Sequence, residues 1–256
     1  MDLIDRGLGY SAINSARCAL SAILGLFDNQ VFGCHDIVTR FMKGVFNSKP
    51  PVARYSCSWD VNSVLTWLRG LSPIKFLSLK DLTLKLVMLL ALVSGQRSQT
   101  LQMLDLSECQ KGASFCFGFG TTLKHSRPGK PAPVVEFKPF PPDRRLCVYT
   151  VMKEYIKRTK LLRGSESRLL ISYIKPHRRV TRDTVARWVK WGLQRSGINT
   201  EVYKPHSTRM ASTSHAFQKG LSLEVIMAAA GWSQAGTFAK FYHKPVKTFA
   251  NTILQS

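Results

Sequence analysis

The sequence feature that most constrains the fold is a long apolar stretch in the first half of the chain. Residues 82–93 form a run of about twelve mostly apolar residues that contains one basic residue, Lys85. The preceding Ser78-Leu-Lys-Asp81 is typical of a helix start, because its polar side chains can cap free backbone N–H groups. A membrane span needs roughly 20 residues. The pattern therefore predicts a helix over residues 78–93, apolar on nearly every side, at the centre of a core.

The charge balance of the chain indicates a polyanionic partner. Its 256 residues include 37 Lys+Arg and 15 Asp+Glu, for a formal net charge of +22. A hydrophobic content of 45% and an aromatic content of 10% exclude a disordered basic tail, because there is ample apolar surface to bury. A secretory signal is not expected, because its apolar segment would have to begin where the sequence has Asp2, Asp5 and Arg6. We expect a soluble, folded, strongly basic protein without a membrane segment.

The positive charge is concentrated in the later part of the chain. Residues 1–50 carry five Lys+Arg and four Asp+Glu, whereas residues 124–195 carry 19 basic and five acidic residues. This asymmetry predicts a binding surface in the later part. The segment Asn47-Ser-Lys-Pro-Pro-Val-Ala-Arg54 has the composition of a linker, because paired prolines favour extended chain. We therefore predict two domains, residues 1–50 and residues 51–256.

Hydrophobic periodicity predicts a mainly helical protein with a small antiparallel sheet, an α+β fold class. Besides the central helix, the predicted helices cover residues 10–27, 34–47, 60–70, 143–160, 181–196, 206–219, 222–230 and 235–242. Short strands are predicted near residues 104–109, 114–120 and 133–138. In the helix over 181–196, one apolar stripe leaves the basic residues on the outer face. That stripe consists of Val185, Trp188, Val189 and Leu193.

The acidic residues and cysteines point away from metal and cofactor chemistry. The 15 acids are spread thinly, without the D-x-D or E-x-x-E/H grouping that a metal-dependent nuclease uses. The six cysteines are scattered with no C-x-x-C pair, so we expect free thiols and no zinc site. No G-x-x-x-x-G-K-[ST] motif indicates an ATP-driven motor. We expect no metal and no small-molecule cofactor, so positive side chains would have to stabilise any phosphoryl transfer.

A group of residues near the carboxyl end could supply such chemistry. Pro205-His206-Ser-Thr-Arg209 predicts a helix start on which His206 and Arg209 share one face. A helix N-terminus favours phosphate through its free N–H groups and dipole, and an arginine adds a bidentate phosphate ligand. Trp232 follows 23 positions after Arg209, and Tyr242 follows ten positions after that. A tyrosine nucleophile, whose pKa is ordinarily about 10, needs a base, for which His206 is the best-placed candidate.

These residues resemble the catalytic end of the tyrosine recombinase family. The family's first arginine is matched by Arg97 in Leu92-Val-Ser-Gly-Gln-Arg97-Ser-Gln-Thr-Leu101, directly after the apolar helix. Its hairpin lysine is matched by Lys124 in Thr121-Thr-Leu-Lys124-His-Ser-Arg-Pro-Gly-Lys130. The resemblance covers residues 60–245, with six roles filled in order. The motifs also resemble recombinases of DIRS-like eukaryotic retroelements in Ser58-Trp-Asp60, Arg127-Pro-Gly-Lys130, Ala229-Ala-Gly-Trp232 and Thr237-Phe-Ala-Lys-Phe-Tyr242.

The resemblance implies a fold, a reaction and a set of partners. Residues 51–256 would be a tyrosine recombinase catalytic domain, and residues 1–50 part of the helical core-binding domain that clamps DNA. The reaction would be metal-independent cleavage and rejoining of double-stranded DNA through a 3′-phosphotyrosyl intermediate, by a homo-tetramer on DNA. Its biological role would be recombination or integration of a mobile element in the nucleus. The implied catalytic residues are Arg97, Lys124, His206, Arg209, Trp232 and the nucleophile Tyr242.

The sequence leaves several alternatives open. Lys130 lies on the same predicted hairpin as Lys124 and competes with it for the catalytic role. A catalytically silent or truncated DNA-binding relic, or a type IB topoisomerase-like nicking-closing enzyme, would share many of these residues. Only about two helices fit before residue 50, where the family usually has four or more, so the clamp is expected to be incomplete. The basic residues expected to contact DNA are Arg127, Lys130, Arg178, Arg179, Arg187 and Lys190.

Overall fold

The chain divides into two compact units, residues 1–54 and residues 55–256. The computed structural model describes residues 2–51, 54–120 and 134–232, together with Gly236, Phe238, Tyr242 and residues 244–246. Each unit is described by itself. Within the described ranges, no helix combines the length and the apolar character needed to cross a bilayer. All six cysteines are free thiols.

The first unit consists mainly of two helices joined by a short hairpin. Its elements are α1 (Asp2–Asp5), α2 (Tyr10–Leu24), β1 (Leu26–Phe27), β2 (Gln30–Val31), the 3₁₀ turn η1 (Phe32–Cys34) and α3 (Asp36–Ser48). The helix predicted over residues 10–27 ends earlier, because Gly25 adopts a φ of 62° and a β1–β2 hairpin follows. The buried core of this unit is small and consists of Ile13, Met42 and Val45.

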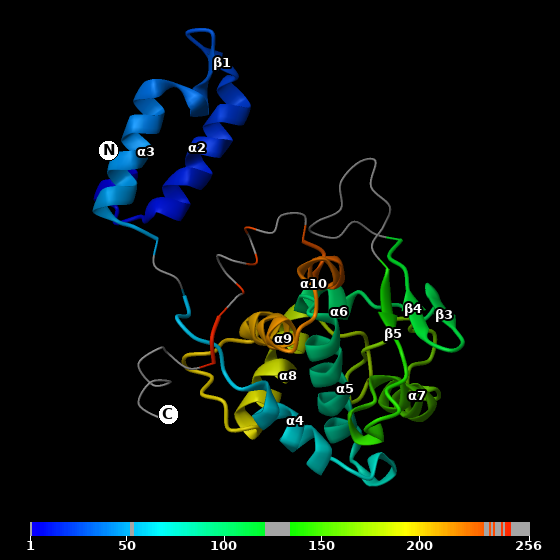
Figure 1. Cartoon of the computed structure of the whole chain (residues 1–256). Helices are drawn as coiled ribbons and strands as arrows, with labels where there is room; N and C mark the ends of the chain where they lie inside the picture. Colours follow the sequence, from blue (N-terminus) through cyan, green and yellow to red (C-terminus); the bar gives the residue numbers. More distant parts are fainter. Residues whose placement is uncertain are drawn as a thin grey trace, which may run out of the picture. The chain divides into compact units, whose positions relative to one another are not determined.

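The second unit is built around one central helix, α5. Figure 1 shows α5 in the middle of this unit, with α7, α8 and α9 packed against it. The elements of the unit are α4 (Val61–Gly70), η2 (Ile74–Phe76), α5 (Leu79–Ser94), α6 (Ser98–Gln102), β3 (Cys109–Lys111), β4 (Phe115–Phe117), β5 (Val135–Phe137), η3 (Arg144–Leu146), α7 (Val148–Thr159), α8 (Arg182–Arg195), α9 (Ser207–Gln218) and α10 (Leu223–Ala230).

Helix α5 forms where the apolar stretch predicted it. The Ser78 hydroxyl accepts a hydrogen bond from the Asp81 N–H at 3.0 Å, which caps the first turn. Every residue from 82 to 91 is buried. Gly95 ends the helix in the left-handed conformation, with a φ of 57°. Because Arg97 follows only two residues later, the rigid core helix determines where this arginine lies.

The single lysine of the apolar stretch is fully buried. Lys85 Nζ donates hydrogen bonds to the carbonyl oxygens of Leu68 at 2.8 Å and Leu71 at 2.6 Å. These carbonyls belong to the end of α4, where a helix has no backbone partners for its last C=O groups. Burial lowers the pKa of the Lys85 ammonium to about 8, although the nearby Asp143 partly opposes this effect. Lys85 therefore joins the end of α4 to the core helix.

The small sheet is antiparallel, with strand order β3–β4–β5. Phe115 and Phe117 of β4 lie opposite Phe137 and Val135 of β5, and all four side chains are buried. The first strand comprises residues 109–111 and not the predicted 104–109. Within the predicted range, Asp105 forms an isolated antiparallel bridge with Arg168, and its carboxylate accepts hydrogen bonds from both the N–H and the hydroxyl of Ser107, in a turn that separates this bridge from β3. The predicted fold class, mainly helical with a small antiparallel sheet, is confirmed.

Helix α8 packs closely on α5 through its apolar stripe, as its periodicity predicted. Trp188 and Leu193 are buried, whereas Arg187 is exposed. A Cβ atom at Gly192 would lie 2.5 Å from Met88 Cγ, so glycine allows the two helices to approach. The helices predicted over residues 181–196, 206–219 and 222–230 match α8, α9 and α10 to within one residue. The helix predicted over 235–242 falls largely outside the described residues.

Candidate active site

Five of the six predicted catalytic side chains belong to described residues, and they lie together. Arg97 directly precedes α6, His206 directly precedes α9, and Arg209 lies in the first turn of α9. These three line one cavity of about 20 Å³. Trp232 follows directly after Gly231, the residue that ends α10. Its ring lies against the Tyr242 ring and against the Arg209 guanidinium. Residues separated by more than a hundred positions thus form one site.

Tyr242 lies within hydrogen-bonding distance of His206. Its Oη is 3.2 Å from His206 Nε2, and the two ring planes make an angle of 69°. The tyrosine backbone is held on both sides: its N–H donates to the Phe238 carbonyl at 2.8 Å, and its carbonyl accepts from the Ser214 hydroxyl. The same hydroxyl accepts from the Lys244 N–H at 3.1 Å. An imidazole nitrogen at this distance can accept the phenol proton.

Arg209 is the most buried charged group of the site, with 2% of its surface exposed. Its Nη1 donates to the Gly95 carbonyl at 2.8 Å, and its Nη2 donates to the Ala230 carbonyl at 2.6 Å. The guanidinium carbon lies 4.6 Å from the centre of the Trp232 ring and 5.6 Å from that of Tyr242. Among the described residues, this guanidinium is therefore held by backbone carbonyls and aromatic rings and not by a carboxylate.

The pKa of Arg209 reflects this environment. Burial and, to a smaller extent, the positive charge of Arg97 together lower it to about 10, and Tyr242 partly opposes both. A guanidinium with this pKa still carries its charge at neutral pH. The repulsion from Arg97 shows that two positive groups have been brought together in one place. Such an arrangement favours a bound anion, because an anion relieves that repulsion.

Two buried N–H donors at the site have no protein partner among the described residues. They are Arg209 Nε and Trp232 Nε1. Leaving a buried donor unpaired costs about 1–3 kcal/mol. Both atoms are therefore available to an oxygen acceptor, and phosphate oxygens are acceptors of the right kind.

The backbone N–H groups at the start of α9 are not free, contrary to the expectation from sequence. Those of Ser207, Thr208 and Arg209 donate to the carbonyls of the preceding turn, at 2.8, 3.2 and 3.3 Å. The turn that brings His206 into place uses these donors. Recognition at this helix end therefore depends on side chains.

Sequence reasoning missed two polar side chains that line the same cavity, Gln96 and Thr208. They are only 8% and 3% exposed, and neither Gln96 Oε1 nor Thr208 Oγ1 has a partner among the described residues. Gln96 Nε2 donates to the Ala229 carbonyl at 2.6 Å. Their positions beside Arg97 and Arg209 in the sequence were the one available signal, and spacing alone cannot distinguish them from packing residues.

Trp59, in the motif Ser58-Trp-Asp60, also supports the site. Its Nε1 donates to the Ser207 hydroxyl at 2.9 Å, and both residues are buried. The neighbouring Ser58 N–H donates to the Pro245 carbonyl at 2.7 Å. One short segment thus contacts both the first turn of α9 and the chain that follows Tyr242, so it helps to keep the histidine and the tyrosine together.

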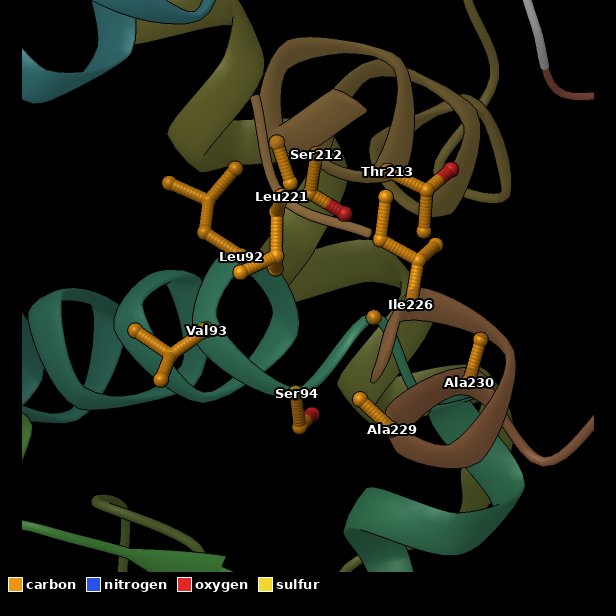
Figure 2. Close-up of a pocket in the computed structure, with 11 residues that line it drawn as sticks. Leu92, Val93, Ser94, Ser212, Thr213, Leu221, Ile226, Ala229 and Ala230 are labelled. Atoms are coloured by element: carbon orange, nitrogen blue, oxygen red, sulfur yellow. The ribbon is translucent and has the colours of Figure 1, made fainter. Parts of the chain in front are cut away.

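An apolar hollow of about 70 Å³ adjoins the backbone that holds Arg209. It is formed by the end of α5 together with α9 and α10. Figure 2 shows Leu92, Thr213, Ile226 and Ala230 among the side chains around it. Gly95 and Ala230, whose carbonyls bind Arg209, belong to this lining. The guanidinium acceptors are therefore fixed by the packing of three helices.

The predicted DNA-contacting residues are only partly described. Arg178 and Arg179 are exposed at the end of the loop 172–178, where Arg179 forms an antiparallel bridge with Ile171 and the Arg178 carbonyl accepts from the Ser172 N–H at 2.8 Å. Arg187 is exposed on α8, and Lys190 Nζ lies 3.9 Å from the Glu201 carboxylate. Outside the described residues lie Lys124, Arg127 and Lys130. In the part of the chain that the structure describes, no three His, Cys, Asp or Glu side chains are grouped closely enough to hold a metal ion.

Comparisons with known proteins agree on one family. The model of the Phage integrase family matches residues 73–247. A tyrosine recombinase of Thermosipho africanus (strain TCF52B) is 26% identical over 102 residues, which are 40% of this chain and 32% of that protein. The chain therefore spans about a third of the length of this curated relative.

Solved structures share the fold at low sequence identity. The Tn1549 transposon integrase in complex with transposon right end DNA has a TM-score of 0.62 and 15% identity, over 99% of this chain and 81% of that one. XerA recombinase has a TM-score of 0.57 and 12% identity, over 96% of this chain and 82% of that one. Because the family model covers more than half of the sequence, the chain belongs to the phage integrase family.

Proposed function

We propose that this protein cleaves and rejoins DNA strands through a covalent 3′-phosphotyrosyl intermediate, and thereby carries out site-specific recombination. The observation that carries the proposal is the 3.2 Å approach of Tyr242 Oη to His206 Nε2, beside the buried guanidinium of Arg209. A nucleophile, a base and a fixed positive charge are the three groups that metal-independent attack on a phosphodiester requires.

The proposed reaction begins with proton transfer from the Tyr242 hydroxyl to His206. As Tyr242 Oη bonds to phosphorus, the bond from phosphorus to the 5′ oxygen breaks, and that oxygen takes up a proton. The family resemblance assigns this proton to Lys124, with Lys130 as the competing candidate. The product is a 3′-phosphotyrosyl bond and a free 5′-hydroxyl. Attack by a 5′-hydroxyl of another strand reverses the step and joins the strands, with the phosphodiester energy conserved.

Arg97, Arg209 and Trp232 would stabilise the negative charge that develops on the non-bridging oxygens. The unpartnered donors Arg209 Nε and Trp232 Nε1 support this role, because they are buried and cost nothing to reorganise during the reaction. Removing one such preorganised donor in other enzymes slows catalysis about 10²–10³-fold.

The proposal also assigns basic residues to DNA binding and several copies of the protein to one assembly on DNA. Arg127, Lys130, Arg178, Arg179, Arg187 and Lys190 would bind DNA phosphates without recognising sequence. Residues 1–50 would form part of a DNA clamp, and four copies would act together on two duplexes. We place the reaction in the life cycle of a mobile element of the DIRS-like kind, in the nucleus of a eukaryotic cell.

The experiment is capture of the intermediate on a nicked suicide DNA, in which cleavage releases a short fragment that carries the free 5′-hydroxyl and diffuses away. The wild-type protein should form a covalent protein–DNA adduct, and Tyr242→Phe should form none. Tyr173→Phe is the matched control, because it removes a hydroxyl from a ring that is stacked on Trp188 in the core. An adduct that persists in Tyr242→Phe would refute the nucleophile assignment.

Two other functions predict different results in the same system. A silent DNA-binding relic would bind the DNA and form no adduct. A type IB topoisomerase-like enzyme would form the adduct and relax supercoiled DNA, but it would not join two duplexes. Mixing two DNAs with different labels separates this outcome from recombination, which alone yields products carrying both labels.

A further inference from the structure

The first residues of the second unit hold the turn that carries His206, on both sides of the histidine in the sequence. Before it, the rings of Tyr55 and Tyr203 stack with their centroids 5.5 Å apart. After it, Trp59 Nε1 donates a hydrogen bond to the Ser207 hydroxyl at 2.9 Å, across 148 positions of the chain. The turn that presents the proposed base is therefore fixed by a segment far away in the sequence.

The same segment also contacts the chain that carries the proposed nucleophile. The Ser58 N–H donates to the Pro245 carbonyl at 2.7 Å. Between Tyr242 and Pro245 the backbone is fixed by Ser214, whose hydroxyl donates to the Tyr242 carbonyl and accepts from the Lys244 N–H. Because Ser58 directly precedes the tryptophan, one peptide unit joins the contact with the tyrosine segment to the contact with the histidine turn.

Together with the 3.2 Å approach of Tyr242 Oη to His206 Nε2, these contacts form a closed ring. The ring runs through Tyr242, Pro245, Ser58, Trp59, Ser207 and His206. Displacing a reacting group by 1 Å can slow a reaction about 10²-fold. Besides the proton-transfer pair itself, the bond from Trp59 to Ser207 is the one link of this ring between two side chains, so a substitution can remove it alone.

Burial indicates that this bond does more than fill space. Trp59 is 4% exposed and Ser207 has no exposed surface. Packing alone needs no polar atom at either position, and burying an indole N–H and a hydroxyl is unfavourable unless they find partners. Here each atom satisfies the other, which specifies where Ser207 lies and, with it, the neighbouring histidine.

We propose that Trp59 and Ser207 are positioning residues for the transfer of the Tyr242 proton to His206. The indole N–H fixes the Ser207 hydroxyl, and thereby the residue next to the base, relative to the chain that carries the nucleophile. Neither side chain is among the groups that contact the phosphate in the proposed reaction, so both act on the chemical step and not on DNA binding. This assignment rests on the proposed function, because it names what keeps its nucleophile and its base within reach.

Single-turnover adduct formation on the nicked suicide DNA tests the assignment in Trp59→Phe, Ser207→Ala and the double variant. Phenylalanine keeps an aromatic ring at position 59 and removes the indole N–H. The control is Trp67→Phe, because Trp67 is a partly buried tryptophan of α4 that packs against the same core. Thermal unfolding confirms that each variant is folded, and fluorescence anisotropy gives its Kd for DNA.

We expect each single variant to form adduct at least tenfold more slowly than the wild type at pH 7, with a Kd for DNA within twofold. Trp67→Phe should keep the wild-type rate within twofold. The double variant should be at most threefold slower than the slower single variant, because both substitutions break the same bond. Should Trp59→Phe fail to fold, Ser207→Ala decides. Wild-type rates in the single variants, or a double variant whose loss is the product of the two single losses, overturn the positioning role.

The pH dependence of the rate separates positioning from a general loss of structure. A phenol, whose pKa is ordinarily about 10, loses its proton to solvent more readily as the pH rises, so solvent can replace a displaced His206. The deficit of Ser207→Ala should therefore shrink at least threefold between pH 7 and pH 9. Arg209, which also faces the Tyr242 ring, keeps most of its charge at pH 9, because its pKa is about 10. An equal deficit at both pH values contradicts a role in proton transfer.

A measurement on the protein without DNA distinguishes failure of this inference from failure of the proposed function. The ¹⁵N NMR signal of His206 Nε2, assigned from His206→Gln, reports the hydrogen bond to Tyr242, so Tyr242→Phe should shift it. In the Ser207→Ala background, Tyr242→Phe should shift it less than half as far. If the wild type forms no adduct while these shifts are as expected, the strand-cleavage proposal fails and the positioning role stands. If the shift is equally large in both backgrounds, or absent in the wild type, the positioning role is wrong.

Discussion

The burial of Lys85 in the core helix makes a prediction about stability and pH. Its Nζ has no exposed surface and donates to the Leu68 and Leu71 carbonyls at 2.8 and 2.6 Å. A neutral amine can still donate both hydrogen bonds, but it avoids the cost of a buried charge. Deprotonation of Lys85 should therefore stabilise the folded protein, and Lys85→Met should remove this effect.

The sign follows from proton binding by the two states. The pKa of Lys85 is about 8 in the folded protein, against an ordinary value of 10.5. Between these pH values the unfolded chain binds more protons than the folded chain, so the free energy of unfolding rises with pH. The full difference corresponds to about 3 kcal/mol, of which about 2.5 kcal/mol develops between pH 7 and pH 10.

Urea unfolding of the wild type and Lys85→Met at pH 7 and pH 10 tests the prediction. Other groups titrate in the same range, including Cys109, where burial raises the pKa of the thiol to about 11. They affect both proteins equally, so the measured quantity is the difference between the two free energies of unfolding. It should change by about 2.5 kcal/mol in favour of the wild type at the higher pH. A difference that is constant across the range would refute the assignment of a depressed pKa to Lys85.

Three further predictions concern the site, the surface and the core. Trp232→Phe keeps a ring against Arg209 but removes the unpartnered Nε1 donor, so adduct formation should slow about 100-fold in single-turnover assays while DNA affinity stays constant. Replacing Arg178 and Arg179 by alanine should lower the slope of log Kd for DNA against log salt concentration by about 2. The control is Arg195→Ala, which should leave this slope unchanged, because the charge of Arg195 is already paired with Asp81 at 2.8 Å. Gly192→Ala should cost about 1–3 kcal/mol in denaturant unfolding, because its Cβ would lie 2.5 Å from a methionine of α5; an unchanged stability would show that the side chain moves aside freely.

Local signals in the sequence were sufficient to predict the long helices of the second unit, residues 55–256. The capping pattern at Ser78 and the apolar stretch predicted α5, and helical periodicity predicted α8, α9 and α10 almost to the residue. Boundaries decided by single residues were missed. Gly25 ends α2 early through its left-handed backbone, and the Asp105 turn delays the first strand of the sheet. These features depend on local backbone geometry that hydrophobic periodicity does not record.

The sequence by itself determined which residue types could perform phosphoryl transfer, because Arg97, His206, Arg209, Trp232 and Tyr242 occur in a recognisable order. Only the tertiary structure decided how they meet. The hydrogen-bonding distance between His206 and Tyr242 and the backbone carbonyls that hold Arg209 join segments that are well separated in the chain. Such contacts depend on how α5, α9 and α10 pack, and burial gives each polar atom an energetic weight that its position in the sequence does not reveal.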